Sequence, residues 1–323
     1  MLISDCIMTN VADPVTGAKS NALLLDADRI SVADCIVDCG GTGFVGRKTA
    51  DLHVTGCRIT NASYVITDDS NGAGFVKRFV GCQISTERVC RVNANGKYYF
   101  DGCTIRAESN AFEQVKGTLV LTGCNATFLG YGFIIWSENA DIELHGTVIS
   151  CPTDAPCFTL VNAPGATVKT HGLTVNGKNL ASAKVTFEPG MKRTTTMLDM
   201  AATFTGQYIN PTHGRASTNS SSACTGYVKV EPGCEVTITG LKLTSPRSIC
   251  VYMKDDVVPD VNEFQVVAQS TDETSVTFVV PDGYHYVRAT TSYAGGVAGT
   301  ITGEQYVWRE SGADLSQVEE QIS

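Results

Sequence analysis

Two consecutive stretches of the sequence, KYYFDGCTIRA (residues 97–107) and TLVLTGCNATF (residues 118–128), align without a gap. In both, apolar and polar residues alternate, a glycine precedes a cysteine, and an apolar residue follows two places later. The same phrase recurs from about Asp5 to Val175. Its cysteine position is held in turn by Cys6, Cys35, Cys57, Cys82, Cys103, Cys124, Thr147 and Leu173. Subtracting successive positions gives steps of 29, 22, 25, 21, 21, 23 and 26 residues. A period in the twenties with variable insertions is typical of a solenoid.

The aligned positions predict three strands and one sharp corner in each repeat. The residue before the cysteine is always aspartate or glycine, which favours a bend with positive φ. Residues five and three places before the cysteine, and two places after it, are apolar apart from Lys77 and Thr170, so they predict two strands with one buried face. A third strand is predicted in NALLL, TGFVG, SYVIT, RVCRV, AFEQV, GFIIW and CFTLV.

Three strands and a glycine corner per repeat predict a parallel β-helix over residues 1–190. The alternative is an ordinary β-sandwich in which the cysteine spacing is accidental. The region resembles the right-handed parallel β-helices of pectate lyases and phage tailspikes, over roughly half of the chain. The resemblance lies in the repeat pattern and includes no catalytic motif. It implies a right-handed coil, the usual hand of parallel crossovers.

Composition limits the partners and cofactors. The 323 residues carry a formal net charge of −9, which disfavours nucleic acid and anionic membranes as partners. No apolar run is long enough for a membrane helix, so membrane insertion is not expected. The 13 cysteines have no metal-binding spacing. We interpret most of them as an interior ladder of free thiols, with disulfides between neighbouring coils as the alternative. No metal or other cofactor is predicted.

The second half of the sequence lacks this repeat and has a different residue pattern. A junction is expected at 191–204, and short strands with turn residues between them predict an antiparallel β-sandwich or jelly roll at 205–310. Its phrases GYVKVEPG, CEVTITGL, ICVYMKDD and SVTFVVPDGYHYVRA resemble β-sandwich modules in tail and fibre proteins of phages and prophages of Gram-positive gut bacteria, and carbohydrate-binding jelly rolls in general. The final residues, 311–323, predict a short helix that begins a coiled coil. The predicted fold class is therefore all-β with a C-terminal helix.

Candidate catalytic residues come from the carboxylates near the third strand of successive repeats. Glycoside hydrolysis needs two such groups, about 5 Å apart for retention or about 6.5–9.5 Å for inversion. The candidates are Asp68, Asp69, Glu113, Glu138 and Asp141. Polar residues on a solenoid surface are also expected simply because water surrounds them.

A second candidate site is the outward column four places before the cysteine. It reads Ser31, His53, Arg78, Tyr99, Val120, Glu143 and Lys169, with Asp101, His145 and His171 two places further on. Exposed aromatic rings can stack on sugar rings. The predicted carbohydrate-binding residues are Trp136, Tyr131, Tyr99, His145 and His171. In a trimer, the same face could instead be buried between subunits.

These features favour a tail-fibre or tailspike-type protein of a phage or prophage, which recognises a host-surface glycan on a rigid trimeric β-helix. The expected partners are a cell-surface or capsular polysaccharide and two further copies of the chain. The expected location is the virion tail, or otherwise the cell exterior or cell surface. Two alternatives stay open: a polysaccharide lyase or glycoside hydrolase with a carbohydrate-binding module, and a bacterial surface adhesin. The sequence does not decide whether the protein is an enzyme.

Overall fold

The computed structural model describes residues 1–10, 21–25, 27–46, 51–68, 75–243, 247–255, 259–260, 262–269 and 273–311. The described residues form strands and turns, without a helix. They divide into two compact units. The first contains residues 1–175 and 179–192 and those from 308 onward, and the second contains residues 176–178 and 193–307. The helix predicted at 311–323 lies, apart from Ser311, outside the described residues.

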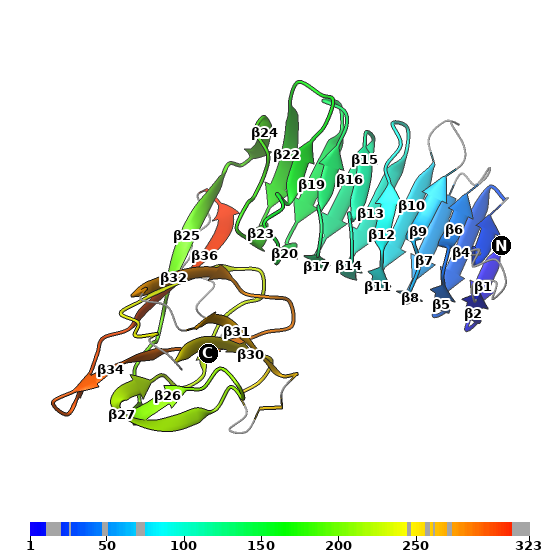
Figure 1. Cartoon of the computed structure of the whole chain (residues 1–323). Coiled ribbons are helices and arrows are strands. Elements are labelled where there is room, and N and C mark those ends of the chain that lie inside the picture. The colour runs from blue at the N-terminus through cyan, green and yellow to red at the C-terminus, as the bar shows by residue number, and fades with distance from the viewer. Residues whose placement is uncertain are drawn as a thin grey trace. The chain divides into compact units, whose positions relative to one another are not determined.

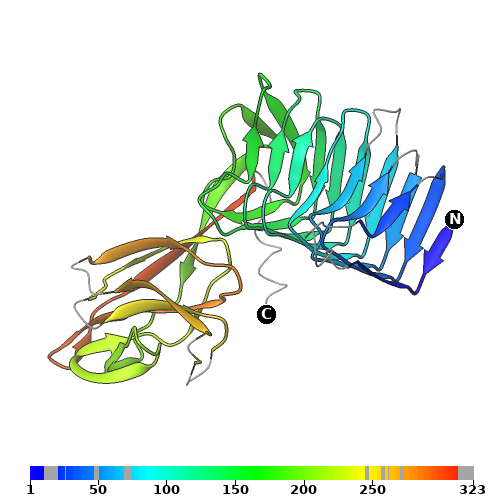
Figure 2. The ribbon, with the colours of Figure 1, turned by 45° about the vertical axis from the view of Figure 1, so that its right-hand side comes forward.

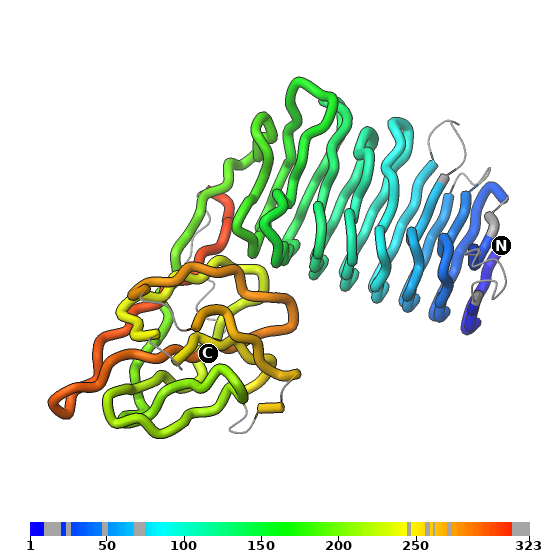
Figure 3. Tube along the Cα trace, viewed as in Figure 1, coloured from blue at the N-terminus to red at the C-terminus, as the bar shows by residue number. Residues whose placement is uncertain are grey.

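The first unit is a solenoid of three parallel sheets, as predicted. In Figures 1 and 3 its coils stack in chain order, and Figure 2 shows the same stack from a second direction. Sheet A contains, in spatial order, β1 (Leu2–Ser4), β4 (Arg29–Ala33), β7 (Asp51–Thr55), β10 (Val76–Val80), β13 (Lys97–Asp101), β16 (Thr118–Thr122), β19 (Asp141–His145), β22 (Ala166–His171) and β24 (Val185–Glu188).

Sheets B and C complete each coil. In the first unit, sheet B contains β2 (Ile7–Asn10), β5 (Ile36–Cys39), β8 (Arg58–Thr60), β11 (Gln83–Thr86), β14 (Thr104–Ala107), β17 (Asn125–Phe128), β20 (Val148–Cys151) and β23 (Thr174–Gly177). Sheet C contains β3 (Leu23–Leu25), β6 (Thr42–Gly46), β9 (Tyr64–Asp68), β12 (Arg88–Arg91), β15 (Phe112–Val115), β18 (Phe133–Ile135) and β21 (Phe158–Leu160). Because like positions pair from coil to coil, side chains of successive repeats stack at about 4.8 Å.

The corner before each cysteine position has the predicted positive φ in all eight repeats. The values run from 51° to 71° at Asp5, Asp34, Gly56, Gly81, Gly102, Gly123, Gly146 and Gly172. Left-handed backbone strains most residues but costs glycine little, and aspartate tolerates it better than most. The corner therefore explains why only these two residue types occupy the position.

The cysteine positions form an interior ladder, also as predicted. Twelve of the thirteen cysteines are buried and Cys6 is exposed, and all thirteen are free. From Cys35 to Cys124, each ladder thiol lies within hydrogen-bond distance of a carbonyl of the coil before it, for example Cys103 Sγ of Phe79 O at 3.4 Å and Cys124 Sγ of Phe100 O at 3.3 Å. Thr147 makes the equivalent bond to Leu121 O at 3.3 Å. From Cys35 to Thr147 the position thus holds a small side chain with a donor, which accounts for the threonine, whereas the last repeat has the buried Leu173 there.

Stacked aromatic rings form another part of the solenoid core, together with aliphatic side chains. Phe79 lies on Phe100 with 4.9 Å between ring centroids. Phe133 lies between two further rings, those of Phe112 at 5.1 Å and Phe158 at 4.5 Å, and both pairs are near-parallel. The two polar exceptions in the inward columns are buried as well: Lys77 places its ammonium 4.7 Å from the Phe75 ring, and Thr170 is 7% exposed.

The second unit is built from antiparallel pairs. One sheet has the order β26 (Phe204–Ile209), β27 (Ala216–Cys224), β34 (Thr290–Ala294) and β35 (Val297–Ala298), and another has β28 (Val228–Lys229), β33 (Tyr286–Arg288), β30 (Ser248–Tyr252) and β31 (Phe264–Gln269). β29 (Glu235–Thr239) pairs with β32 (Ser275–Val279) and β36 (Thr302–Glu310), and β36 also pairs with β25 (Met191–Leu198). The sandwich arrangement of these sheets stays a prediction.

Candidate functional site

The outer face of sheet A is the surface on which the most polar candidate residues come together. Register places the central outward residues of successive strands side by side. This central column reads Ser31, His53, Arg78, Tyr99, Val120, Glu143, Lys169 and Glu188. On β16 the outward residues are uncharged: Thr118, Val120 and Thr122. They separate two clusters, one on β4–β13 and one on β19–β24.

The cluster on β19 and β22 joins two carboxylates through one ammonium. Lys169 Nζ donates to Asp141 Oδ1 at 2.8 Å and to Glu143 Oε1 at 3.2 Å. These two bonds raise the pKa of Lys169. His145 Nε2 lies 3.3 Å from the other oxygen of Glu143, and His145 is in register with His171 on the next strand. All of these side chains are partly exposed. The cluster can therefore bind polar groups or exchange protons with a ligand that lies on the sheet.

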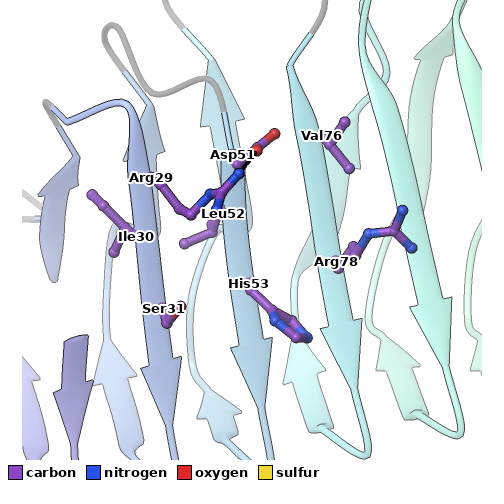
Figure 4. Close-up of a pocket in the computed structure, with 8 residues that line it drawn as sticks. All are labelled: Arg29, Ile30, Ser31, Asp51, Leu52, His53, Val76 and Arg78. Carbon is purple, nitrogen blue, oxygen red and sulfur yellow. Dashed lines mark ion pairs between the residues drawn. The ribbon is translucent and has the colours of Figure 1, made fainter. Parts of the chain in front are cut away.

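The cluster on β4–β13 surrounds a shallow pocket of about 320 Å³ (Figure 4). Arg29, Asp51, His53 and Arg78 are its charged or titratable lining residues. Arg29 Nη2 lies 3.6 Å from Asp51 Oδ2. In Figure 4, His53 and Arg78 project from the neighbouring strands β7 and β10. The Arg78 guanidinium lies over the Tyr99 ring, 4.4 Å from its centroid.

Glu113 lies in a different place, on sheet C, where four side chains surround its carboxylate. Tyr64 donates to Glu113 Oε2 at 2.7 Å and Asn110 to Oε1 at 3.1 Å. Arg88 Nε lies 3.1 Å from Oε1, and Arg91 Nε donates to Oε2 at 3.5 Å.

This arrangement fixes the protonation states of Glu113 and Tyr64. Burial pushes the pKa of Glu113 upward, but hydrogen bonds from Tyr64 and Asn110 and the charges of Arg88 and Arg91 outweigh it, so the pKa lies below its ordinary value. Burial and the bond to Glu113 raise the pKa of Tyr64. At neutral pH the carboxylate is thus ionised and the phenol neutral. A general acid needs a raised pKa, so this environment does not favour that role for Glu113.

The other predicted catalytic carboxylates do not join Glu113. Glu138 is exposed in the turn after β18 and lines a separate hollow of about 490 Å³ with Lys184 and Thr186. Asp141 belongs to the cluster on sheet A. Asp68 is the last residue of strand β9, and the structure describes its backbone only. Asp69 lies outside the described residues.

The predicted sugar-binding residues also separate. Tyr99, His145 and His171 lie on the outer face of sheet A. Trp136 follows β18, with the Lys116 ammonium 5.4 Å from its ring centroid, so cations lie over the rings of both Tyr99 and Trp136. Tyr131 lies in the turn before β18 and is 39% exposed. Of the predicted aromatic platforms, Tyr131 is the one without a cation over its ring among the described contacts.

Sequence reasoning missed Tyr64, Arg88 and Arg91. Their signal was present: SYVIT, RVCRV and AFEQV are third strands of successive coils, and aligning their outward positions brings Tyr64 beside Arg88 and Arg91 beside Glu113. Among the described residues no three histidine, cysteine or acidic side chains are grouped to hold a metal ion. No helix able to cross a membrane was found in the described part of the chain.

A scan against protein-family models found no match, and neither did a search of curated proteins. A search of solved structures found a likeness to the enzymatically active domain of tailspike protein 4 of bacteriophage CBA120, with 13% sequence identity and a TM-score of 0.26. The likeness covers 87% of this chain and 55% of that one, so this chain spans about half the length of that structure. At this TM-score the likeness carries no information about function.

Proposed function

We propose that this chain is a tailspike- or tail-fibre-type protein of a phage or prophage, and that its solenoid recognises a host-surface glycan. The observation that carries the proposal is the outer face of sheet A. Charged, hydroxyl and aromatic side chains stand there in register from one strand to the next, with Arg78, Tyr99 and Glu143 in one central column. A linear polysaccharide repeats its polar groups along its length, and a ladder of repeating side chains suits such a ligand.

The construction of the solenoid supports this role because it keeps the face fixed. Parallel pairing runs through all nine strands of sheet A, and buried rings and thiols hold the coils from inside. A site on a rigid scaffold loses little conformational entropy on binding. Assembly into a homotrimer, a place in the virion tail, and a carbohydrate-binding β-sandwich in the second unit belong to the same proposal. They rest on the resemblance of the sequence pattern to phage tail proteins.

Binding of purified chain to capsular and uronate polysaccharides tests this proposal by calorimetry. We expect saturable binding to at least one polymer, and about tenfold weaker binding for Glu143→Ala, because it removes a partly exposed carboxylate that can accept hydrogen bonds from the hydroxyl groups of a sugar. Gln83→Ala, on the outer face of sheet B, is the matched control and should bind normally. Absence of binding to every polymer, or equal loss in both variants, would contradict the proposal.

Light scattering tests the trimer, which requires three times the 34.3 kDa of one chain.

One observation favours a second function, glycoside hydrolysis on the same face. Asp141 Oδ1 and Glu143 Oε1 both accept from the same atom, Lys169 Nζ, at 2.8 and 3.2 Å. The distance between these two oxygens therefore cannot exceed the sum of the two hydrogen-bond lengths. That upper limit is shorter than the roughly 6.5–9.5 Å of inverting enzymes, and it leaves room for the roughly 5–5.5 Å of retaining ones. The cluster thus supplies two neighbouring carboxylates within the spacing limit of a retaining mechanism, with a histidine beside them.

Release of reducing ends from the bound polysaccharide tests the hydrolase. We expect Asp141→Asn and Glu143→Gln each to reduce the release by about 10²-fold or more, because each removes a carboxylate that acts in the reaction. Glu138→Gln, outside the cluster, is the comparison and should keep normal activity. A chain that binds the polymer and releases no reducing ends is a binding protein only.

A further inference from the structure

Arg78 differs from the other charged residues on the outer face of sheet A in how it is held. Its guanidinium lies 4.4 Å from the centroid of the Tyr99 ring, and Figure 4 shows the side chain reaching from β10 toward the next strand. Arginine that stacks on an aromatic ring keeps the N–H donors at its edge free for other partners. Within the described part of the chain, Arg78 forms no ion pair with a carboxylate, whereas Arg29 faces Asp51 and Lys169 binds Asp141 and Glu143.

The pocket beside Arg78 is positive in a protein that is negative overall. Its lining holds Arg29 and Arg78 against one carboxylate, Asp51, with His53 in register between Ser31 and Arg78. Outside the lining, β13 adds one cation, Lys97 next to Val76, and one carboxylate, Asp101 next to Val80, so the excess of positive charge remains. The whole chain has a net charge of −9. A local excess of positive charge on an acidic protein favours an anionic ligand at that point.

We propose that this pocket is a subsite for a carboxylate group of an acidic polysaccharide, bound by the planar edge of Arg78. The proposal rests on the proposed function and adds the class of glycan and its position. A guanidinium can bind a carboxylate through two parallel hydrogen bonds, and the contact with the Tyr99 ring holds the Arg78 guanidinium on this face of the sheet. The two carboxylates of Asp141 and Glu143 would repel a carboxylate of the ligand placed beside them, although they can still accept hydrogen bonds from its hydroxyl groups. The uronate groups of a polymer therefore meet the face at β4–β13.

The test compares oligogalacturonate with its methyl ester of equal length, because the two differ in charge and share the sugar. We expect the wild-type chain to bind the acid form at least about tenfold more tightly, and the difference to shrink as salt rises. Arg78→Ala should abolish this preference, and Arg78→Lys should keep part of it because the charge remains and the planar edge is lost. Arg58→Ala, an exposed arginine on the outer face of sheet B, should leave binding unchanged. Thermal unfolding of each variant checks that it is folded.

The outcomes separate this proposal from the proposed function. If neutral glycans bind and the acid form shows no preference, or if Arg78→Ala keeps the preference, the subsite assignment is wrong and glycan recognition stands. If sulfated dextran binds as tightly as oligogalacturonate and depends equally on Arg78, the assignment of the subsite to a carboxylate is wrong. If no glycan of any charge binds, both proposals fail. If Arg78→Lys prefers the acid form as strongly as the wild type does, the positive charge alone explains the preference and the planar edge of Arg78 has no role in it.

Discussion

Phe133→Ala is expected to lower the free energy of unfolding of the solenoid by about 3–5 kcal/mol. Phe133 is completely buried and stacks between Phe112 and Phe158, with Phe128 at its edge, 5.7 Å between centroids. Alanine would leave a cavity in the middle of the ring stack, and parallel strands on both sides prevent the coil from collapsing into it. Denaturant unfolding followed by circular dichroism measures the loss.

Tyr131→Ala is the control for this prediction, because it also truncates an aromatic ring next to β18. Tyr131 is 39% exposed, so its loss should cost no more than about 0.5 kcal/mol. A Phe133→Ala change of less than about 1 kcal/mol would mean that the ring stack does not hold the coils together.

Glu113→Ala is expected to lower the free energy of unfolding by about 2–3 kcal/mol at neutral pH. The Glu113 side chain is 15% exposed, and its removal leaves Arg88, Arg91 and the Tyr64 hydroxyl without their shared acceptor. Glu113→Gln should cost less, because an amide oxygen still accepts the Tyr64 bond. Glu108→Ala breaks an exposed pair with Arg106 and should cost well under 1 kcal/mol.

The Glu113 contribution should also depend on pH with a definite sign. Its pKa is lower in the folded chain than in the unfolded one, so folding favours the ionised form. The stabilisation is then complete above the unfolded value of about 4.3 and disappears as pH falls through the folded value. Wild type and Glu113→Gln should therefore converge in stability under acid conditions. A gap that stays constant from neutral pH to about pH 2 would contradict the network.

The sequence predicted the solenoid because its constraints repeat. Every coil needs a positive-φ corner, and the aspartate and glycine before Cys35, Cys57 and Cys82 report that constraint directly. Inward positions are apolar for the same reason in each coil. The hydrogen bond from each ladder thiol to the preceding coil was not visible in composition, although Thr147 in the cysteine column was a sign of it.

The candidate site was less predictable because it depends on where long side chains end. Register alone placed Arg78 next to Tyr99, but not the guanidinium over the ring. It also could not show that Lys169 joins Asp141 to Glu143. Glu113 lies outward on sheet C, while Glu138 falls in a turn, because the insertion lengths between strands differ from coil to coil. In the second unit, the phrases CEVTITGL, ICVYMKDD and SVTFVVPDGYHYVRA, with turn residues between them, contain the strands β29, β32 and β33 and most of β30.

The most direct test of the account is a crystal structure of the chain with an oligosaccharide cut from a polymer that it binds. We predict that the sugar lies along the outer face of sheet A and contacts Arg78 or the cluster of Glu143 and Lys169. An oligosaccharide bound on the outer face of sheet B or sheet C, or in the second unit, with the outer face of sheet A empty, would contradict it.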